Sequence, residues 1–157
     1  MSDYTRFYGL DVHKDTIAVA VAESNGAPPE FMGKILNREA TVGQWLRRQW
    51  AKGIQAEACL MCYEAGPCGY GLYRYLESKG IACQVVAPGL TPNKPNERIK
   101  TDRRDAVKLA EYLRSGHLTS IWVPDERHEV FRQLLRARQS CVQDRTRLRN
   151  RLSKFLL

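Results

Sequence analysis

The sequence lacks any hydrophobic run that approaches the length of a membrane span, and charged residues interrupt every apolar stretch near its N-terminus. These absences exclude a transmembrane helix and a secretory signal peptide, so we expect a cytoplasmic protein with no membrane partner. An internal repeat and a low-complexity tract are also missing. The 157 residues, 43% of them hydrophobic and 27% charged, are typical of one globular domain with a substantial core.

A disulfide framework is absent as well. The chain contains five cysteines, an odd number without the spacing of a disulfide scaffold. Cys59 and Cys62 have the spacing of a zinc knuckle, but they lie in a predicted strand, where a separation of three places the thiols on opposite faces. A second ligand pair of suitable spacing is missing. We therefore expect reduced, mostly buried thiols.

The net charge of +8 is concentrated in the C-terminal part of the chain. Residues 127–157 contain nine Lys or Arg and two acids, whereas residues 1–126 contain 16 and 15. A nearly neutral body with one basic segment favours a polyanionic partner, and nucleic acid is the common one. A helix face exposed to water is the alternative, which the charge alone leaves open.

The order of apolar segments and turn residues predicts an α/β fold. The expected strands are 6–12, 16–22, 31–36, 56–64 and 81–87, and the expected helices are 42–50, 68–79 and 100–113. Thr41 and Gln44 form a T-x-x-Q pattern that predicts a capping box for the first helix. Three strands followed by alternating helices and strands indicate a mixed sheet with helices on its faces.

One long helix is expected from about Asp125 onward. Its apolar residues include four that recur every seven positions: Leu134, Cys141, Leu148 and Phe155. This spacing indicates a face that packs on another helix, although Asp144 and Arg151 between them are polar. We therefore divide the chain into a domain of residues 1–124 and a basic helical segment of residues 125–157.

Four carboxylates occupy positions where core residues are expected. Asp102 and Asp105 continue the apolar face of the 100–113 helix toward its N-terminus, Asp11 lies inside the first strand, and Glu64 ends the strand 56–64. A helix cap with a first-turn acid explains the helical pair equally well when it is considered alone. The other two acids have the similar alternative of hydrogen-bonded residues in or at the end of a strand.

Together, the four acids favour a metal site. Adjacent strands and a helix packed across their ends would bring them into one cluster, and clustered carboxylates need a cation to remain ionised. Oxygen ligands from Asp and Glu suit Mg²⁺ or Mn²⁺. A pair of such ions binds a phosphate that undergoes displacement.

The stretches that carry these acids also resemble a known family. The aspartate in GLDVHKDTIAVAV, the glutamate in YEAGPCGYGLYRYL and the two aspartates in KTDRRDAVKLAEYL resemble the DEDD motif of insertion-sequence transposases related to the pilin gene inverting protein. The resemblance covers nearly the whole chain. It implies a ribonuclease H-like (RuvC-like) catalytic domain for Mg²⁺-dependent phosphoryl transfer on DNA. Its metal and catalytic residues would be Asp11, Glu64, Asp102 and Asp105.

The resemblance also implies that these residues are not the complete enzyme. Full-length members of the family carry a C-terminal transposase domain with a serine nucleophile, and some are directed by a guide RNA. This chain ends before such a domain, so we expect the fragment to be inactive alone. Two alternatives remain open at this stage: a stand-alone junction-resolving nuclease that uses water, and a non-catalytic module for nucleic-acid binding and dimerisation.

Basic residues near the acids and in the long helix are the expected contacts with DNA phosphates. They are Lys94, Arg98, Lys100, Arg103, Arg104, Arg145 and Arg149. His13 shares a strand face with Asp11 and can border the site, but we do not count it as a ligand. The long helix is also expected to join copies of the chain into a homo-oligomer.

Overall fold

The computed structural model describes residues 4–90 and 101–157, and its elements follow the predicted order. The strands are β1 (Arg6–Val12), β2 (Thr16–Glu23), β3 (Glu30–Leu36), β4 (Cys59–Glu64) and β5 (Ala82–Val86). The helices are α1 (Glu39–Trp50), α2 (Gly71–Ser78), α3 (Asp102–Arg114) and α4 (Glu126–Phe155), and two short 3₁₀ turns are η1 (Ala56–Ala58) and η2 (Pro88–Leu90). In the described part of the chain, no helix is long and apolar enough to cross a membrane.

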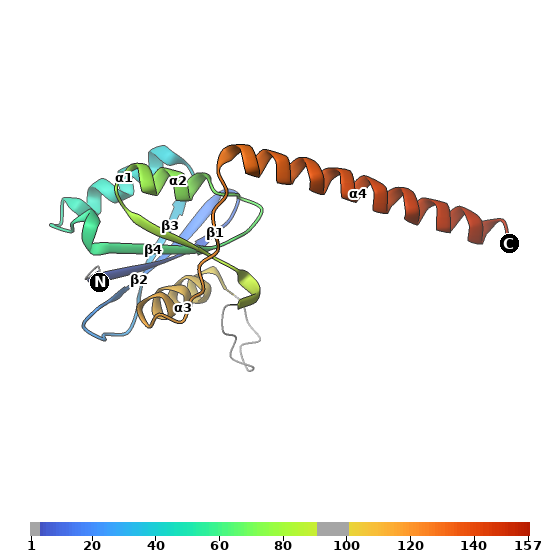
Figure 1. Cartoon of the computed structure of the whole chain (residues 1–157). Coiled ribbons are helices and arrows are strands. Elements are labelled where there is room, and N and C mark those ends of the chain that lie inside the picture. Colours follow the sequence, from blue (N-terminus) through green and yellow to red (C-terminus); the bar gives the residue numbers. More distant parts are fainter. Residues whose placement is uncertain (1–3, 91–100) are drawn as a thin grey trace. The chain divides into compact units, whose positions relative to one another are not determined.

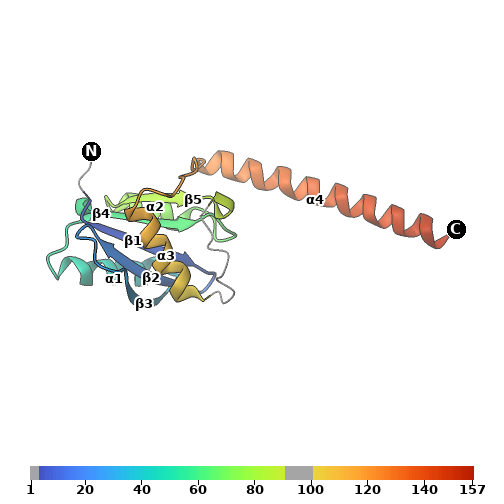
Figure 2. The same ribbon diagram turned by 90° about the horizontal axis from the view of Figure 1, so that it is seen from below.

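The five strands form one mixed sheet in the order β3-β2-β1-β4-β5. β2 runs antiparallel to β1 and β3, whereas β4 runs parallel to β1 and β5. Helices α1 and α2 cover one face and α3 covers the other (Figures 1 and 2). This arrangement confirms the predicted α/β class, and the strand order is that of a ribonuclease H-like fold.

The alternation of side chains along β1 decides which residues face α3. Tyr8 points to the opposite face, where its ring meets Trp45 of α1 edge-on with centroids 5.6 Å apart. Gly9 and Asp11 therefore share the α3 face. On the neighbouring strand, Cys62 of β4 pairs with Gly9 and its sulfur lies 3.7 Å from the carbonyl oxygen of Leu109 in α3.

Small side chains allow α3 to lie unusually close to β1 and β2. A buried cluster joins β2 and α3 through Ala18, Ala20, Ala22, Ala106 and Ala110. Gly9 lies under the same helix, where a β-carbon would be 2.8 Å from the side chain of Leu109 and closer still to the Ala106 backbone. This close approach fixes α3, and with it the residues of its first turn, against the sheet.

The edge strand β3 contains a bulge that changes which side chains face α3. Ala20 pairs with Phe31 and Val19 pairs with Gly33, so Met32 is an extra residue in β3. Gly33 has φ of +108°, a conformation that glycine adopts at little cost. Beyond the bulge, Ala18 pairs with Lys34. Phe31 and Lys34 therefore lie on the same face, although simple alternation would separate them.

The C-terminal end of α3 is held to the connection between β2 and β3. Arg114 donates from Nη1 to the carbonyl oxygens of Glu23, at 3.1 Å, and Ala27, at 2.5 Å. At the other end of the helix, Thr101 is the N-cap and accepts a 3.4 Å hydrogen bond from the Arg104 amide. Both ends of α3 therefore have defined polar contacts.

The predicted capping box of α1 is wrong. The helix begins at Glu39 after Arg38, and no side chain caps it. The Thr41 amide already bonds to the carbonyl oxygen of Arg38 at 2.9 Å, so Thr41 lies within the first turn. The helix starts earlier because only two residues separate it from β3, and an acid in its first turn, Glu39, complements the helix dipole.

The chain consists of two compact units, Met1–Trp122 and Val123–Leu157. The second unit contains α4, whose N-cap Asp125 accepts a 2.8 Å hydrogen bond from the His128 amide. No residue of α4 is buried. Its large apolar side chains are exposed, including Leu134 at 65% and Leu148 at 62%.

Candidate metal centre

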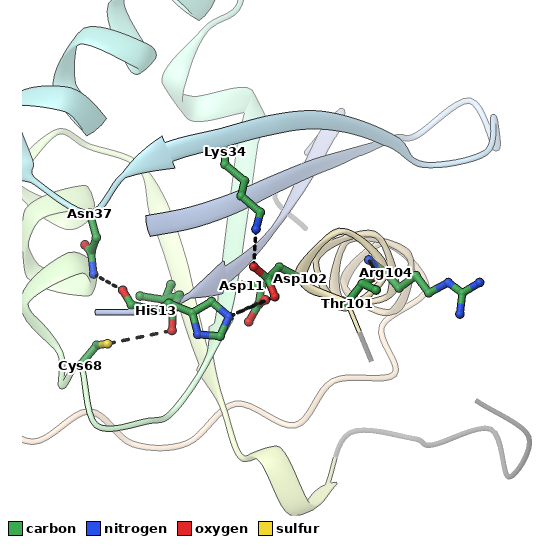
Figure 3. Close-up of polar contacts among 9 residues, drawn as sticks. Asp11, His13, Lys34, Asn37, Cys68, Thr101, Asp102 and Arg104 are labelled. Carbon is green, nitrogen blue, oxygen red and sulfur yellow. Dashed lines mark hydrogen bonds and ion pairs between the residues drawn. The ribbon is translucent and has the colours of Figure 1, made fainter. Parts of the chain in front are cut away.

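Asp11, His13 and Asp102 form a polar cluster at one end of the sheet. One ligand atom from each residue lies within 4.8 Å of the other two. The His13 Nε2 atom is 3.1 Å from Asp11 Oδ2 and 3.6 Å from Asp102 Oδ1. Figure 3 shows the imidazole beside the two carboxylates, which come from β1 and from the first turn of α3. Residues far apart in the sequence therefore converge here.

Lys34 completes the cluster from the β3 side. Its Nζ atom lies 2.5 Å from Asp102 Oδ2 (Figure 3). Asp102 thus has a cation at one oxygen and the His13 ring near the other. Hydrogen bonding to Lys34 lowers the pKa of Asp102 below its ordinary value of 3.8.

Asp11 has the opposite electrostatic environment. Burial raises its pKa above the ordinary value of 3.8, against the effect of His13, and the neighbouring charges of Asp102 and Asp105 raise it further. The side chain of Asp11 is 21% exposed, less than the 35% of Asp102. A partly buried carboxylate beside others of the same charge is stabilised in its ionised form by a cation.

Glu64 and Asp11 line the same cavity. The cavity has a volume of about 700 Å³, and its other walls include His13, Asn37 and Cys68. Glu64 is the last residue of β4 and is exposed. It lies on the α3 face of the sheet, two residues after Cys62. The structure therefore brings Glu64 to the same edge as Asp11, but outside the tight cluster with His13 and Asp102.

Asp105 lies one turn further along α3 than Asp102. Its amide bonds to the Thr101 carbonyl oxygen at 3.0 Å, and its side chain is half-buried. Its charge acts on Asp11, although it too is outside the tight cluster. The apolar face predicted for the helix is confirmed, because Ala106, Leu109 and Leu113 are buried.

The donor set fits a hard divalent cation. Two carboxylates and an imidazole are close enough to bind one ion, and Glu64 and Asp105 lie nearby with further oxygens. Carboxylate oxygens suit Mg²⁺ and Mn²⁺ alike, whereas imidazole nitrogen is more typical of Zn, Cu, Fe or Ni sites. The backbone around His13 is held by Asn37, whose Nδ2 donates to the His13 carbonyl oxygen at 2.7 Å (Figure 3).

The predicted DNA contacts fall in three places. Lys94, Arg98 and Lys100 lie outside the described residues. Arg103 and Arg104 are exposed in the first turn of α3, with the Arg103 guanidinium 5.5 Å from the centre of the Phe31 ring. Within the second unit, Arg145 and Arg149 line a shallow groove on α4 together with apolar residues such as Leu148.

Two members of the cluster are not among the site residues that the sequence predicts. The sequence places His13 at the border of the site, whereas the structure puts its ring within reach of both Asp11 and Asp102. Lys34 is not singled out by any motif. Its position depends on the β3 bulge, for which the isolated glycine at position 33 is the one local signal.

The fold and this acidic edge define a ribonuclease H-like domain whose carboxylates can bind metal. Residues 8–157 match the family of IS110-type DEDD transposases, which carries the description "Transposase". The chain belongs to that family.

Curated relatives agree with this assignment. The y4qE protein of Sinorhizobium fredii (strain NBRC 101917 / NGR234), which carries the name of a transposase, is 45% identical over all of this chain and 40% of its own length. The transposase of insertion sequence element IS1533 from Leptospira borgpetersenii is 40% identical over 96% of this chain and 43% of its own length. The chain thus spans about two fifths of these relatives.

Among solved structures, the chain is similar to the large terminase nuclease from the thermophilic phage G20c. The two are 13% identical, with a TM-score of 0.41, over 74% of this chain and 58% of the nuclease.

Proposed function

We propose that this chain is the metal-binding catalytic part of a DEDD transposase that acts on DNA phosphodiesters in the cytoplasm. Residues 1–124 form the catalytic domain, and residues 125–157 begin a basic helical segment. The observation that carries the proposal is the convergence of Asp11 and Asp102, from β1 and α3, within one cluster of 4.8 Å. Family membership supports the same role.

Asp11, Glu64, Asp102 and Asp105 are the proposed metal ligands and catalytic residues. The ions are Mg²⁺ or Mn²⁺, and we propose two of them, which would polarise the phosphate and stabilise the oxygen that it loses. Asp11 and Asp102 hold the centre of the site, while Glu64 approaches from the cavity side and Asp105 from further along α3. Close packing of α3 on β1 fixes the positions of these side chains relative to one another.

The basic side chains supply contacts with the DNA backbone. Arg103 and Arg104 are exposed in the first turn of α3, and Figure 3 shows the Arg104 side chain directed away from Asp11 and Asp102, so we propose that they contact DNA phosphates outside the metal centre. Arg145 and Arg149 of α4 provide a second contact with DNA or with a guide RNA. Lys94, Arg98 and Lys100 remain proposed contacts.

The exposed apolar residues of α4 support a homo-oligomer. Leu148, Leu152 and Phe155 are 62%, 60% and 86% exposed. Side chains of this size on one helix are typical of a face that packs against another helix. We propose that a second copy of the chain covers this face.

Strand exchange needs a nucleophile in addition to metal. The family resemblance implies that a C-terminal domain supplies this nucleophile as a serine, whereas the ligands that we propose in this chain are carboxylates. We therefore expect the 157 residues to bind metal and DNA without completing strand exchange alone. Cleavage of branched DNA by this polypeptide would instead favour a stand-alone nuclease.

Isothermal titration with Mn²⁺ tests the metal assignment. The wild-type chain is expected to bind Mn²⁺, and Asp102→Ala is expected to bind it much more weakly because it removes a central ligand. Asp15→Asn is the matched control, since Asp15 is an exposed acid in the hairpin turn. Equal binding by the wild type and Asp102→Ala would refute the proposal.

A further inference from the structure

Lys34 reaches the metal centre from a strand that carries none of its proposed ligands. Asp11 of β1 pairs with Ala18 of β2, and Ala18 pairs with Lys34 of β3, so the three side chains share the face that α3 covers. Ala18 has only a methyl group between the two longer side chains. The lysine can therefore extend over β2 and place its ammonium group on Asp102 (Figure 3).

The β3 bulge makes this contact possible. The extra residue Met32 and the positive φ of Gly33 shift the strand by one residue, which turns Lys34 toward α3. Without the bulge, the same lysine would point to the opposite face of the sheet. Bulges beside active sites commonly redirect a side chain in this way.

The ammonium and a metal ion would compete for the same carboxylate. Lys34 binds Oδ2 of Asp102 at 2.5 Å, while Oδ1 of that residue faces His13. Asp102 is also one of the three residues whose ligand atoms converge within 4.8 Å. A divalent ion that binds between Asp11 and Asp102 carries twice the charge of the ammonium and repels it.

We propose that Lys34 is a positioning residue that neutralises and orients Asp102 until a divalent ion displaces it. This inference rests on the proposed function, because it requires Asp102 to be a metal ligand. Lys34 balances the repulsion between Asp102 and Asp11 and holds the Asp102 side chain toward the cluster. In return it lowers the affinity of the site for metal.

Mn²⁺ binding measured by electron paramagnetic resonance of the free ion tests this role. Lys34→Met removes the competing charge, and we expect it to bind Mn²⁺ about fivefold more tightly than the wild type. Lys34→Arg keeps the charge and should bind like the wild type. The control Lys52→Met removes an exposed lysine that follows α1 and should change nothing.

If Lys34 only stabilised the fold, replacing it would not make Mn²⁺ binding tighter. The direction of the change in Mn²⁺ affinity therefore distinguishes the proposed role from a structural one. Unchanged or weaker Mn²⁺ binding by Lys34→Met, with much weaker binding by Asp102→Ala, overturns the role of Lys34 but leaves the metal centre intact. Equal binding by the wild type and Asp102→Ala overturns both proposals. Lys34→Gln provides a second neutral variant, with the same expected direction, if Lys34→Met fails to fold.

The metal-free protein gives an independent readout. In EDTA, Lys34→Met should unfold at a lower temperature than the wild type, because Asp102 and Asp11 then repel each other without a cation. Adding Asp102→Asn to Lys34→Met removes the repulsion and should restore the midpoint. A double variant that unfolds no higher than Lys34→Met would contradict the proposed charge balance.

Discussion

Gly9 of β1 lies directly against the backbone of Ala106 in α3, with no space for a β-carbon between them. Gly9→Ala should therefore push α3 away from the sheet and lower the free energy of unfolding by about 1–3 kcal/mol. Asp102 moves with the helix, so Mn²⁺ affinity should fall as well. Chemical denaturation and Mn²⁺ titration measure the two effects.

Gly71→Ala is the matched control for this substitution. Gly71 begins α2, and apart from its two chain neighbours and the backbone of its own helix, no atom lies within 4 Å of the position that an alanine methyl group would take there. Its replacement should leave Mn²⁺ affinity unchanged and stability equal or slightly higher, because alanine favours a helix. A Gly9→Ala protein with wild-type stability would show that α3 can shift at no cost.

Neutralising Asp11 should stabilise the protein in the absence of metal. The pKa of Asp11 is raised in the folded state, so its ionised form costs stability at neutral pH, and that cost disappears as the pH falls below the raised pKa. Asp11→Asn removes the charge and should raise the unfolding midpoint in EDTA. It should also abolish the stabilisation that Mn²⁺ gives the wild type.

Thermal unfolding with EDTA and with Mn²⁺ separates these two effects of Asp11→Asn. Asp15→Asn, in the exposed turn that follows β1, should behave like the wild type under both conditions. A lower midpoint for Asp11→Asn in EDTA would mean that the ionised carboxylate stabilises the fold.

Metal binding should weaken with acid before Asp102 is protonated. Asp11 has a pKa raised above 3.8, and Asp102 has a pKa lowered below it. Of these two carboxylates, Asp11 therefore takes up a proton first as the pH falls. Its protonation should contribute a slope of about one per pH unit to the decline in log affinity for Mn²⁺, and this contribution should begin above pH 3.8. Titrations between neutral pH and the acid limit of folding measure it. Affinity that stays constant down to that limit would exclude Asp11 as a ligand.

Arg145 and Arg149 should contribute to the salt dependence of DNA binding. If both contact phosphates, replacing them with glutamine should reduce the slope of log affinity against log salt by about 0.9 for each phosphate that is no longer neutralised. Fluorescence anisotropy with duplex DNA at several salt concentrations measures the slope. Gln143→Ala, an uncharged change in the same helix, should leave it unaltered. An unchanged slope in the double variant would place DNA elsewhere on the protein.

The sequence is sufficient to predict the sheet, the helices and the apolar face of α3, because their periodicity reflects burial directly. Asp11 is also recognisable, since an aspartate within an apolar strand is costly without a partner. Lys34 cannot be recognised from the sequence, because the face on which its side chain lies depends on the register between β3 and β2. The one inserted residue in β3 moves every side chain after it to the other face of the sheet. This change is visible only from the strand pairing, in which Lys34 lies opposite Ala18.

Helix caps are the other weak point of prediction. Thr101 caps α3, where the sequence alone offers the Asp102–Asp105 pair as a cap with a first-turn acid, and Thr41 forms no cap in α1. For α1, the reason lies in the short connection that follows β3. Where a strand leads into a helix within two residues, the backbone itself determines the starting point, and the best local capping pattern is overridden.

The contacts of Arg114 help to determine how α3 is oriented at the metal centre. Arg114 holds the far end of α3 to the β2–β3 connection, while Lys34 of β3 meets Asp102 at the near end. Helix α3 is thus attached to the β2–β3 hairpin at both of its ends, which are about 20 Å apart in a helix of this length. Lengthening the turn between β2 and β3 should therefore tilt α3 relative to the sheet. The tilt would change the distance between Asp11 and Asp102, although no residue near them is altered.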